Sequence, residues 1–181
     1  MTNININNIK GIVEWKAPSN IALVKYWGKK GNQIPINPSL SLPLTTSYTQ
    51  TIIEFSPKQG KEQIIDFTLD GRKNPLFANK IQRFLKNICP YMPFVTELDF
   101  KFISKNTFPH SSGIASSASG FAALSLGLCT IEKNISDIPI PDFSQKASLI
   151  SRLGSGSASR SIYEDASLWG KTDLFCNKIP E

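Results

Sequence analysis

The sequence is organised around residues 109–120, a stretch in which nearly every side chain is small. It follows a strand-like segment and precedes the apolar run at 121–128, so it is expected to lead from a strand into a helix. Gly113 and Gly120 allow backbone angles closed to other residues, and the small side chains leave successive backbone N–H groups uncovered. At a helix start such groups converge near the positive end of the helix dipole, where they can bind phosphate. The alternative is an ordinary capped helix with a serine-rich N-terminus.

The composition indicates a folded protein rather than a disordered or membrane-spanning one. With 181 residues, 40% of them hydrophobic, the chain can form one domain with a core. No apolar run is long enough to cross a membrane, and the N-terminus has no signal-peptide pattern. Cys89, Cys129 and Cys176 are odd in number and far apart, which argues against a disulfide framework or a zinc site and favours the reducing cytoplasm. The net charge of +6 suits an anionic partner, either a phosphorylated small molecule or a nucleic acid.

The periodicity of apolar residues predicts strands and helices in a mixed order. A helix starts at Pro75 and stops before Pro90. A second helix runs from the small-residue stretch to about residue 131, and a third covers 143–153. Strands are predicted at 11–15, 21–24, 39–44, 48–55, 64–69 and 98–102, with the last strand near 166–169. This order predicts an α+β fold, not a doubly wound sheet.

Two details of this prediction concern turns and faces. Asp70-Gly71 closes the strand at 64–69 with a tight turn, and residues 31–38 form a turn region with two prolines. Leu40, Leu42 and Leu44 alternate with small or polar residues, as the apolar positions of a half-buried strand do.

Residues 25–30 form a basic and aromatic segment. Three lysines, Lys25, Lys29 and Lys30, lie within six residues and beside Gly28, which allows the chain to turn around an anion such as a diphosphate. The alternative is a solvated basic turn, and the neighbouring aromatic residues more often pack against protein than against a ligand.

Residues 154–160 are rich in glycine and serine and end at Arg160. Glycines let a backbone approach a ligand closely, serine hydroxyls donate hydrogen bonds, and a guanidinium can hold a phosphate or a carboxylate in a fork. The alternative is a flexible linker. The nearby Tyr163 and Trp169 argue against it, because linkers rarely carry large aromatic anchors.

Taken together, these segments resemble a known family. Residues 17–20, with the sequence Ala-Pro-Ser-Asn, and residues 109–118 look like the first two motifs of the GHMP small-molecule kinase superfamily. Residues 25–29 and 154–160 are similar to the narrower signatures of the diphosphomevalonate decarboxylases. The resemblance covers residues 13–169. It implies a ribosomal-protein-type β/α two-layer domain, which the family follows with a ferredoxin-like domain.

The resemblance also implies an activity. In the family, ATP with magnesium phosphorylates the tertiary hydroxyl of diphosphomevalonate, and loss of that phosphate and of carbon dioxide gives isopentenyl diphosphate in the mevalonate pathway of isoprenoid biosynthesis. The implied nucleotide-binding residues, with Ser117 also near the magnesium, are Pro109, Ser112, Gly113, Ile114, Ala115, Ser116, Ser117, Ala118 and Ser119. The implied substrate-binding residues are Lys25, Tyr26, Trp27, Gly28, Lys29, Lys80, Ser155, Gly156, Ser157, Ala158, Ser159 and Arg160.

The chain departs from the family pattern in several places. Lys80 stands where the family has an arginine on the first long helix, and Glu164-Asp165 stands where the family often has two glycines. His110, the only histidine, replaces a small residue and is expected to be a surface or packing residue rather than a catalytic one. The catalytic aspartate of the family has no match here, so we expect residues 1–181 to be an incomplete N-terminal domain, inactive by itself, without the ferredoxin-like domain.

Three other interpretations stay open at this point. The closest is a superfamily kinase that phosphorylates without decarboxylation, the second a basic RNA-binding module, and the third an inactive scaffold. We expect a small-molecule substrate, no nucleic-acid or membrane partner and a cytoplasmic location, and the sequence leaves a homodimer open.

Overall fold

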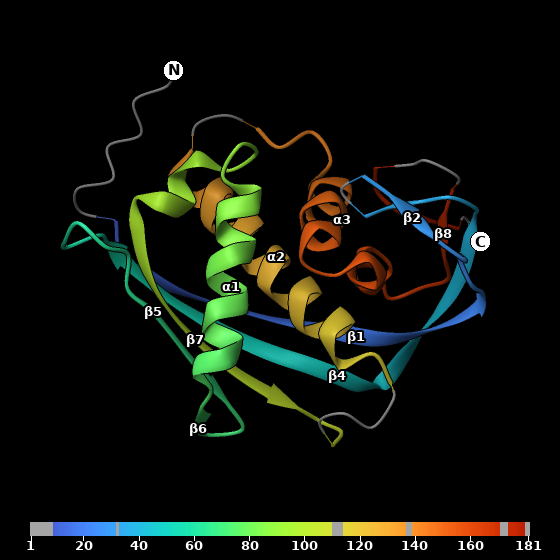
Figure 1. Ribbon diagram of the computed structural model, residues 1–181, viewed down its shortest axis with the longest axis horizontal. Coiled ribbons are helices and arrows are strands. Elements are labelled where there is room, and N and C mark those ends of the chain that lie inside the picture. The colour runs from blue at the N-terminus through green and yellow to red at the C-terminus, as the bar shows by residue number, and fades with distance from the viewer. Residues whose placement is uncertain (1–8, 32, 110–113, 137–138, 171–173, 180–181) are drawn as a thin grey trace.

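The computed structural model describes residues 9–31, 33–109, 114–136, 139–170 and 174–179. Within this part of the chain, strands form one large mixed sheet and three α-helices cover one of its faces, which gives two layers (Figure 1). None of the described helices is both long and apolar enough to cross a membrane. The mixed order of strands and helices confirms the predicted α+β class.

The large sheet has the strand order β6-β5-β7-β4-β8-β9, and β1 pairs with β4 outside this path. Its strands are β1 (Gly11–Val24), β4 (Ser39–Pro57), β5 (Ile65–Leu69), β6 (Arg72–Lys73), β7 (Leu98–Asn106), β8 (Ser167–Trp169) and β9 (Asn177–Lys178). A separate pair consists of β2 (Lys29–Lys30) and β3 (Ile34–Pro35). The helices are α1 (Pro75–Ile88), α2 (Ser116–Ile135) and α3 (Phe143–Gly154), with the 3-10 segments η1 (Pro93–Thr96) and η2 (Gly156–Ile162).

Two long strands replace four predicted short ones. The predicted strands at 11–15 and 21–24 are one strand, β1, and those at 39–44 and 48–55 are one strand, β4. The two strands pair antiparallel along nearly their whole length, with a register shift between Pro18 and Ser19. Pro18, which cannot donate a backbone hydrogen bond, lies within β1. Since β1 pairs only with β4, it lies at the edge of the described sheet, where a proline is tolerated.

The predicted tight turn at Asp70-Gly71 is confirmed. Asp70 has φ 50° and Gly71 has φ 78°, and β6 pairs antiparallel with β5 across this turn. Helix α1 then connects β5 and β6 to β7, which runs parallel to β5. Its start is capped by Asn74, whose side chain accepts a hydrogen bond from the backbone N–H of Phe77 at 3.0 Å.

Helix α2 forms the centre of the core. It packs on β1 and β4 on one side and on α3 and η2 on the other (Figure 1). Gly127 lets the helix approach the sheet closely, because a Cβ there would lie 2.5 Å from Cδ1 of the fully buried Ile53. The helix ends at Ile135, four residues beyond the predicted end at 131, and no proline or glycine lies between these two positions.

Four further expectations need correction. Residues 156–162, for which no helix or strand was predicted, form a 3-10 segment that contacts α2 and α3. The predicted turn region at 31–38 contains β3, which pairs with β2. The strand β8 is not the last, because β9 pairs with it. The alternation in β4 has the opposite polarity from the expected one: Ser39 and Ser41 are buried, whereas Leu42 is 43% exposed.

Candidate functional site

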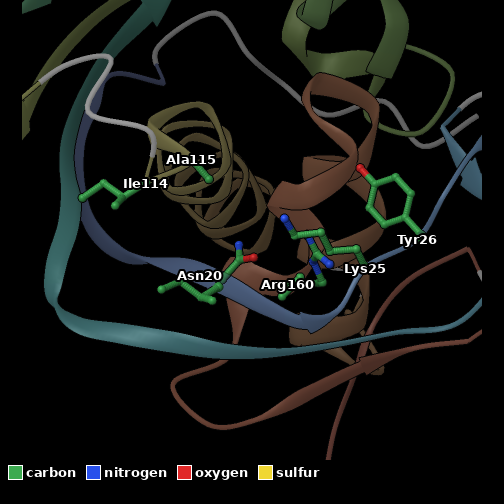
Figure 2. A pocket seen from close by; sticks show the side chains of 8 residues that line it. Asn20, Lys25, Tyr26, Ile114, Ala115 and Arg160 are labelled. Carbon is green, nitrogen blue, oxygen red and sulfur yellow. The ribbon is translucent and has the colours of Figure 1, made fainter.

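A cavity of about 440 Å³ lies at the N-terminal end of α2, where three of the segments singled out in the sequence meet (Figure 2). Strand β1 and the segment after it contribute one side, the start of α2 a second, and η2 a third. Its lining residues are Asn20, Ile21, Ala22, Lys25, Tyr26, Ile114, Ala115 and Arg160. Residues 25–26, 114–115 and 160 therefore line one cavity, and their contacts with a ligand stay predictions.

Arg160 is the most informative residue of this cavity. It is 6% exposed, and its Nε and Nη1 atoms have no hydrogen-bond partner among the described residues. Burial lowers the pKa of the guanidinium below its usual range, since removal from water disfavours the charged form. A buried cation with unused donors is costly unless an anion completes its environment. The cavity is therefore suited to a carboxylate or a phosphate.

Tyr26 organises the cationic side of the cavity. The guanidinium of Arg160 lies 5.3 Å from the centroid of its ring, and the ammonium of Lys29 lies 5.6 Å from the same centroid. Both distances are within the range of cation–π attraction. Trp169, which is fully buried, packs edge to face against Tyr26 with the ring centroids 5.3 Å apart. The tyrosine ring is thus fixed from the core and placed beside two cations.

The position of Lys29 explains why a glycine stands at position 156, at the start of η2. Its ammonium donates to the side-chain oxygen of Gln33 at 2.5 Å, in the turn between β2 and β3. A Cβ at Gly156 would lie 3.0 Å from Nζ of Lys29 and 3.2 Å from Oε1 of Gln33. A larger residue at Gly156 would thus push Lys29 away, so the glycine lets the basic segment approach η2.

Asn20 is a residue that the site prediction missed, although it ends the Ala-Pro-Ser-Asn motif. Its side-chain nitrogen donates to the carbonyl of Ser157 at 3.1 Å and to the hydroxyl of Ser161 at 2.7 Å, which ties β1 to η2. Its neighbour Ser19 donates to the carbonyl of Ile114 and ties β1 to the segment before α2. The Ala-Pro-Ser-Asn motif was the sequence feature that could have pointed to Asn20. Only the fold shows that the motif joins β1 to η2 and to the segment before α2.

The start of α2 has the geometry expected of an anion-binding turn. Ala115 precedes the helix with φ 52°, in the left-handed region, and among the described residues no side chain caps the first turn. The hydroxyl of Ser117 lies 3.4 Å from that of Ser155, so the helix start and η2 adjoin. Pro109 is exposed. The predicted ligand residues Ser112 and Gly113, and also His110, lie outside the described residues.

Several predicted site residues do not reach the 440 Å³ cavity. Lys80 lines a separate cavity of about 120 Å³ together with Ser116 and Ser117, and its ammonium lies 5.8 Å from the ring centroid of Phe77. Trp27 is 88% exposed and Gly28 adjoins Ile36, not the cavity. Their ligand contacts stay predictions.

Two alanines and two serines of the segments at 109–120 and 154–160 also need separate description. Ala118, Ala158 and Ser119 are fully buried, and Ser119 lies 2.6 Å from the hydroxyl of Thr49. Ser159 is fully buried too and donates to the carbonyl of Gly156 at 2.9 Å. In this geometry these side chains hold the elements together, and none of them faces the 440 Å³ cavity.

Fold and site together define a class: an α+β domain that places a buried arginine and neighbouring lysines at the start of a central helix. The family model of the diphosphomevalonate decarboxylase-like N-terminal domain matches residues 17–176. The chain belongs to this family.

Individual relatives agree with the family match. The chain is 32% identical to diphosphomevalonate decarboxylase of Gibberella zeae over 165 residues, which are 84% of this chain and 42% of that protein. It is also 32% identical to the Bos taurus enzyme of the same name, over 94% of this chain and 45% of that one. The crystal structure of mevalonate diphosphate decarboxylase from Staphylococcus aureus superposes with a TM-score of 0.79 at 30% identity, over 95% of this chain and 51% of that one.

A further similar structure is described as a complex with MVAPP, AMPPCP and magnesium. It superposes with a TM-score of 0.74 at 33% identity and covers 94% of this chain and 51% of that one. The chain thus spans about half the length of the relatives it matches.

Proposed function

We propose that this chain is the part of an ATP-dependent diphosphomevalonate decarboxylase that binds the nucleotide and the substrate. The observation that carries the proposal is the buried guanidinium of Arg160, which faces the cavity with unused donors. A diphosphate or a carboxylate would supply the missing partner. The similar structure in complex with MVAPP, AMPPCP and magnesium supports this choice of ligands.

In this proposal the cationic residues bind the two anionic ends of diphosphomevalonate. Arg160 holds one end in a fork, and Lys25 and Lys29 neutralise the other. The substrate is thereby held with its tertiary hydroxyl toward the start of α2. Phosphoryl transfer depends mostly on such positioning and on charge neutralisation, both of which fixed cations provide.

The phosphates of ATP are proposed to lie at the start of α2, where Ala115 turns the chain into the uncapped helix. Magnesium bound with the nucleotide would neutralise phosphate charge, and Ser117 is the residue expected near it. The described residues contain no cluster of three or more histidine, cysteine or acidic side chains. Phosphate oxygens and water would be the metal's expected ligands, because magnesium keeps several waters and commonly binds through substrate phosphates.

Two finer points belong to the same proposal. A cytoplasmic location is part of this proposal, because an odd number of widely spaced cysteines is typical of a reducing compartment. The general base is proposed to lie outside these residues. Asp165 is ion-paired with Lys178 at 2.7 Å, and Asp173 lies outside the described residues.

The binding half of the proposal is tested by calorimetry with diphosphomevalonate on the unaltered chain and on Arg160→Gln. Loss of a charged hydrogen bond costs about 1.5–3 kcal/mol, so the affinity should fall at least about tenfold. Arg72→Gln, which changes an exposed arginine of β6, is the control and should bind normally. Equal affinities of the two variants would refute the assignment of Arg160.

The catalytic half is tested by release of labelled carbon dioxide from carboxyl-labelled diphosphomevalonate with magnesium and ATP. We expect the chain alone to be at least about a hundredfold slower than a complete relative, because a general base typically contributes ~10²–10⁴-fold. A rate within a few-fold of a complete enzyme would place the base within this chain. Formation of ADP without carbon dioxide would indicate a kinase instead.

A further inference from the structure

The short strand β8 buries two of its three side chains next to η2. Ser167 and Trp169 are buried, whereas Leu168 between them is exposed, as the alternation of side chains along a strand requires. Trp169 is paired with Ser39 of β4, which is buried as well. The strand contacts η2, the segment that carries Arg160.

These two side chains contact the two members of the pair formed by Tyr26 and Arg160. The hydroxyl of Ser167 donates to the backbone carbonyl of Arg160 over 3.4 Å. The ring of Trp169 meets that of Tyr26 edge to face, with the centroids 5.3 Å apart. The guanidinium of Arg160 in turn lies 5.3 Å from the centroid of the Tyr26 ring. One strand therefore braces both sides of this cation–π contact, although of these four residues only Tyr26 and Arg160 line the cavity.

The backbone around Tyr26 is fixed separately, by Asn37. The side-chain oxygen of Asn37 accepts a hydrogen bond from the backbone N–H of Trp27 at 2.7 Å, and its side-chain nitrogen donates to the carbonyl of Lys25 at 3.1 Å. These bonds hold the chain on either side of Tyr26 but do not select the rotamer of its side chain. The direction of the ring depends on what packs against it, and the packing of aromatic edges on aromatic faces is directional. The fully buried Trp169 supplies that packing.

The direction of the Tyr26 ring matters to two cations. Cation–π attraction acts over the face of a ring and is lost when the cation leaves it. The ammonium of Lys29 lies 5.6 Å from the same centroid as the guanidinium of Arg160. Arg160 is also buried with no partner for its Nε and Nη1 atoms among the described residues, so it has little else to offset its burial. A tilt of the ring would therefore disturb both cations at once.

The opposite end of the cavity lies away from this arrangement. Figure 2 shows Lys25, Tyr26 and Arg160 at one end and Ile114 and Ala115, which precede α2, at the other. A residue that acts through the ring of Tyr26 should affect the first end alone. A general loss of structure should affect both ends, so the two causes are distinguishable.

We propose that Trp169 is a positioning residue of the anion site, which holds the ring of Tyr26 so that Arg160 and Lys29 face one anionic ligand. The inference rests on the proposed function. It deepens that function by naming a residue outside the cavity that sets the affinity for diphosphomevalonate. Trp169 contacts no ligand and acts through Tyr26, while Ser167 holds the backbone of Arg160 from the same strand.

The first measurement needs no ligand. In protein with isotope-labelled arginine, NMR observes the side-chain protons of Arg160, which are assigned by their absence from Arg160→Gln. The ring current of Tyr26 shifts these protons, and Tyr26→Leu gives their position without the ring. We expect Trp169→Leu to move them most of the way to that position, whereas Trp169→Phe, which keeps a ring, should leave them nearly in place. Unmoved resonances in Trp169→Leu would overturn the proposal.

The second measurement is calorimetry with diphosphomevalonate. Trp169→Leu should lower the affinity about three- to tenfold, within the range expected for loss of the Tyr26 ring, and Trp169→Phe should bind nearly normally. In the Tyr26→Leu background, Trp169→Leu should have no further effect, because a residue that acts through Tyr26 cannot act without it. The affinity for AMPPCP with magnesium should be the same in all these variants as in the unaltered chain.

Phe100→Leu is the matched control for the loss of a buried ring. Phe100 lies on β7, is 2% exposed and stacks on Phe102, with the ring centroids 5.4 Å apart. This variant should lower the free energy of unfolding, as Trp169→Leu does, but should bind diphosphomevalonate normally. If Trp169→Leu does not fold, Trp169→Met takes its place, because its flexible side chain fills the space without a ring.

Additive losses of affinity for Trp169→Leu and Tyr26→Leu would overturn the proposal, as would an equal loss of affinity for diphosphomevalonate and AMPPCP. The proposed function is tested separately by Arg160→Gln. If Arg160→Gln binds diphosphomevalonate normally while the Arg160 resonances move as expected in Trp169→Leu, the proposed function fails and the positioning of Tyr26 stands. If Arg160→Gln loses affinity and Trp169→Leu does not, the proposed function stands and the positioning role fails.

Discussion

The guanidinium of Arg160 lies 5.3 Å from the ring centroid of Tyr26, although the two residues belong to opposite ends of the chain. Tyr26 follows β1, and Arg160 is in η2. The tyrosine ring offers the buried cation an electrostatic partner that carries no charge, so the cation keeps its capacity for an anionic ligand.

This contact makes the ring, rather than the hydroxyl, the important part of Tyr26. Tyr26→Phe should therefore bind diphosphomevalonate nearly normally, whereas Tyr26→Leu should bind about two- to thirtyfold more weakly, which corresponds to about 0.5–2 kcal/mol of cation–π attraction. Calorimetry measures both affinities. An equal loss in the two variants would mean that the hydroxyl, not the ring, makes the contact.

Lys29 and Arg160 lie beside the same ring, so they are expected to share one anionic ligand. Lys29→Gln and Arg160→Gln should each cost about 1.5–3 kcal/mol of binding free energy. In the double variant the two losses should be non-additive, because contacts to one ligand are coupled. Lys30→Gln, which changes the exposed next residue of β2, is the control and should not couple with Arg160→Gln. Strict additivity for Lys29 would assign the two cations to separate ligands.

Two helical glycines should respond to alanine in opposite directions. A Cβ at Gly154 would lie 2.2 Å from Cδ1 of Phe121, so Gly154→Ala is expected to destabilise the fold by about 1–3 kcal/mol through overpacking. A Cβ at Gly120 would meet nothing within 4 Å, so Gly120→Ala should stabilise α2 by about 0.5–1 kcal/mol. Urea unfolding gives both free energies. The same sign for both variants would contradict the packing described around Phe121.

The burial of Cys129 also makes the stability of the fold depend on pH. Desolvation, with a smaller contribution from Glu132, raises the pKa of the Cys129 thiol from 9.0 to about 12. As the pH rises, the thiol therefore ionises in the unfolded chain before it does so in the folded one. The contribution of the thiol to the free energy of unfolding is fully present below pH 9 and is lost as the pH rises toward 12. The slope is at most about 1.4 kcal/mol per pH unit.

The measurement is urea unfolding at several pH values from 8 to 11. The difference in unfolding free energy between the unaltered chain and Cys129→Ala should shrink over this range, because the alanine variant lacks the titrating group. Cys89→Ala is the control, since Cys89 is only half-buried. A constant difference for Cys129→Ala would show that the thiol titrates alike in both states.

Local patterns in the sequence determined several features of this protein by themselves. The turn at Asp70-Gly71 and the start of α1 at Pro75 depend on backbone preferences of a few adjacent residues, and both were predicted correctly. The three segments at 25–30, 109–120 and 154–160 were also recognisable from residue type alone. Glycine, serine and basic residues have chemical capabilities that do not depend on the rest of the chain.

Only the tertiary structure decided which of these residues meet. It brought Lys25, Tyr26 and Arg160 to one cavity and placed Lys80 in another. It also showed that Ser159, which reads as a ligand in the sequence, is buried and bonded within η2. Such outcomes depend on contacts between residues far apart in the chain, which local preference does not specify.

The polarity of β4 shows the same limit most clearly. The alternation of serine and leucine at 39–42 determines that the two residue types face opposite sides, because side chains in a strand alternate with a period of two. It does not determine which side is inside. That was decided by the pairing of β4 with β1 and β8 beneath η2, which left the serines buried and Leu42 exposed.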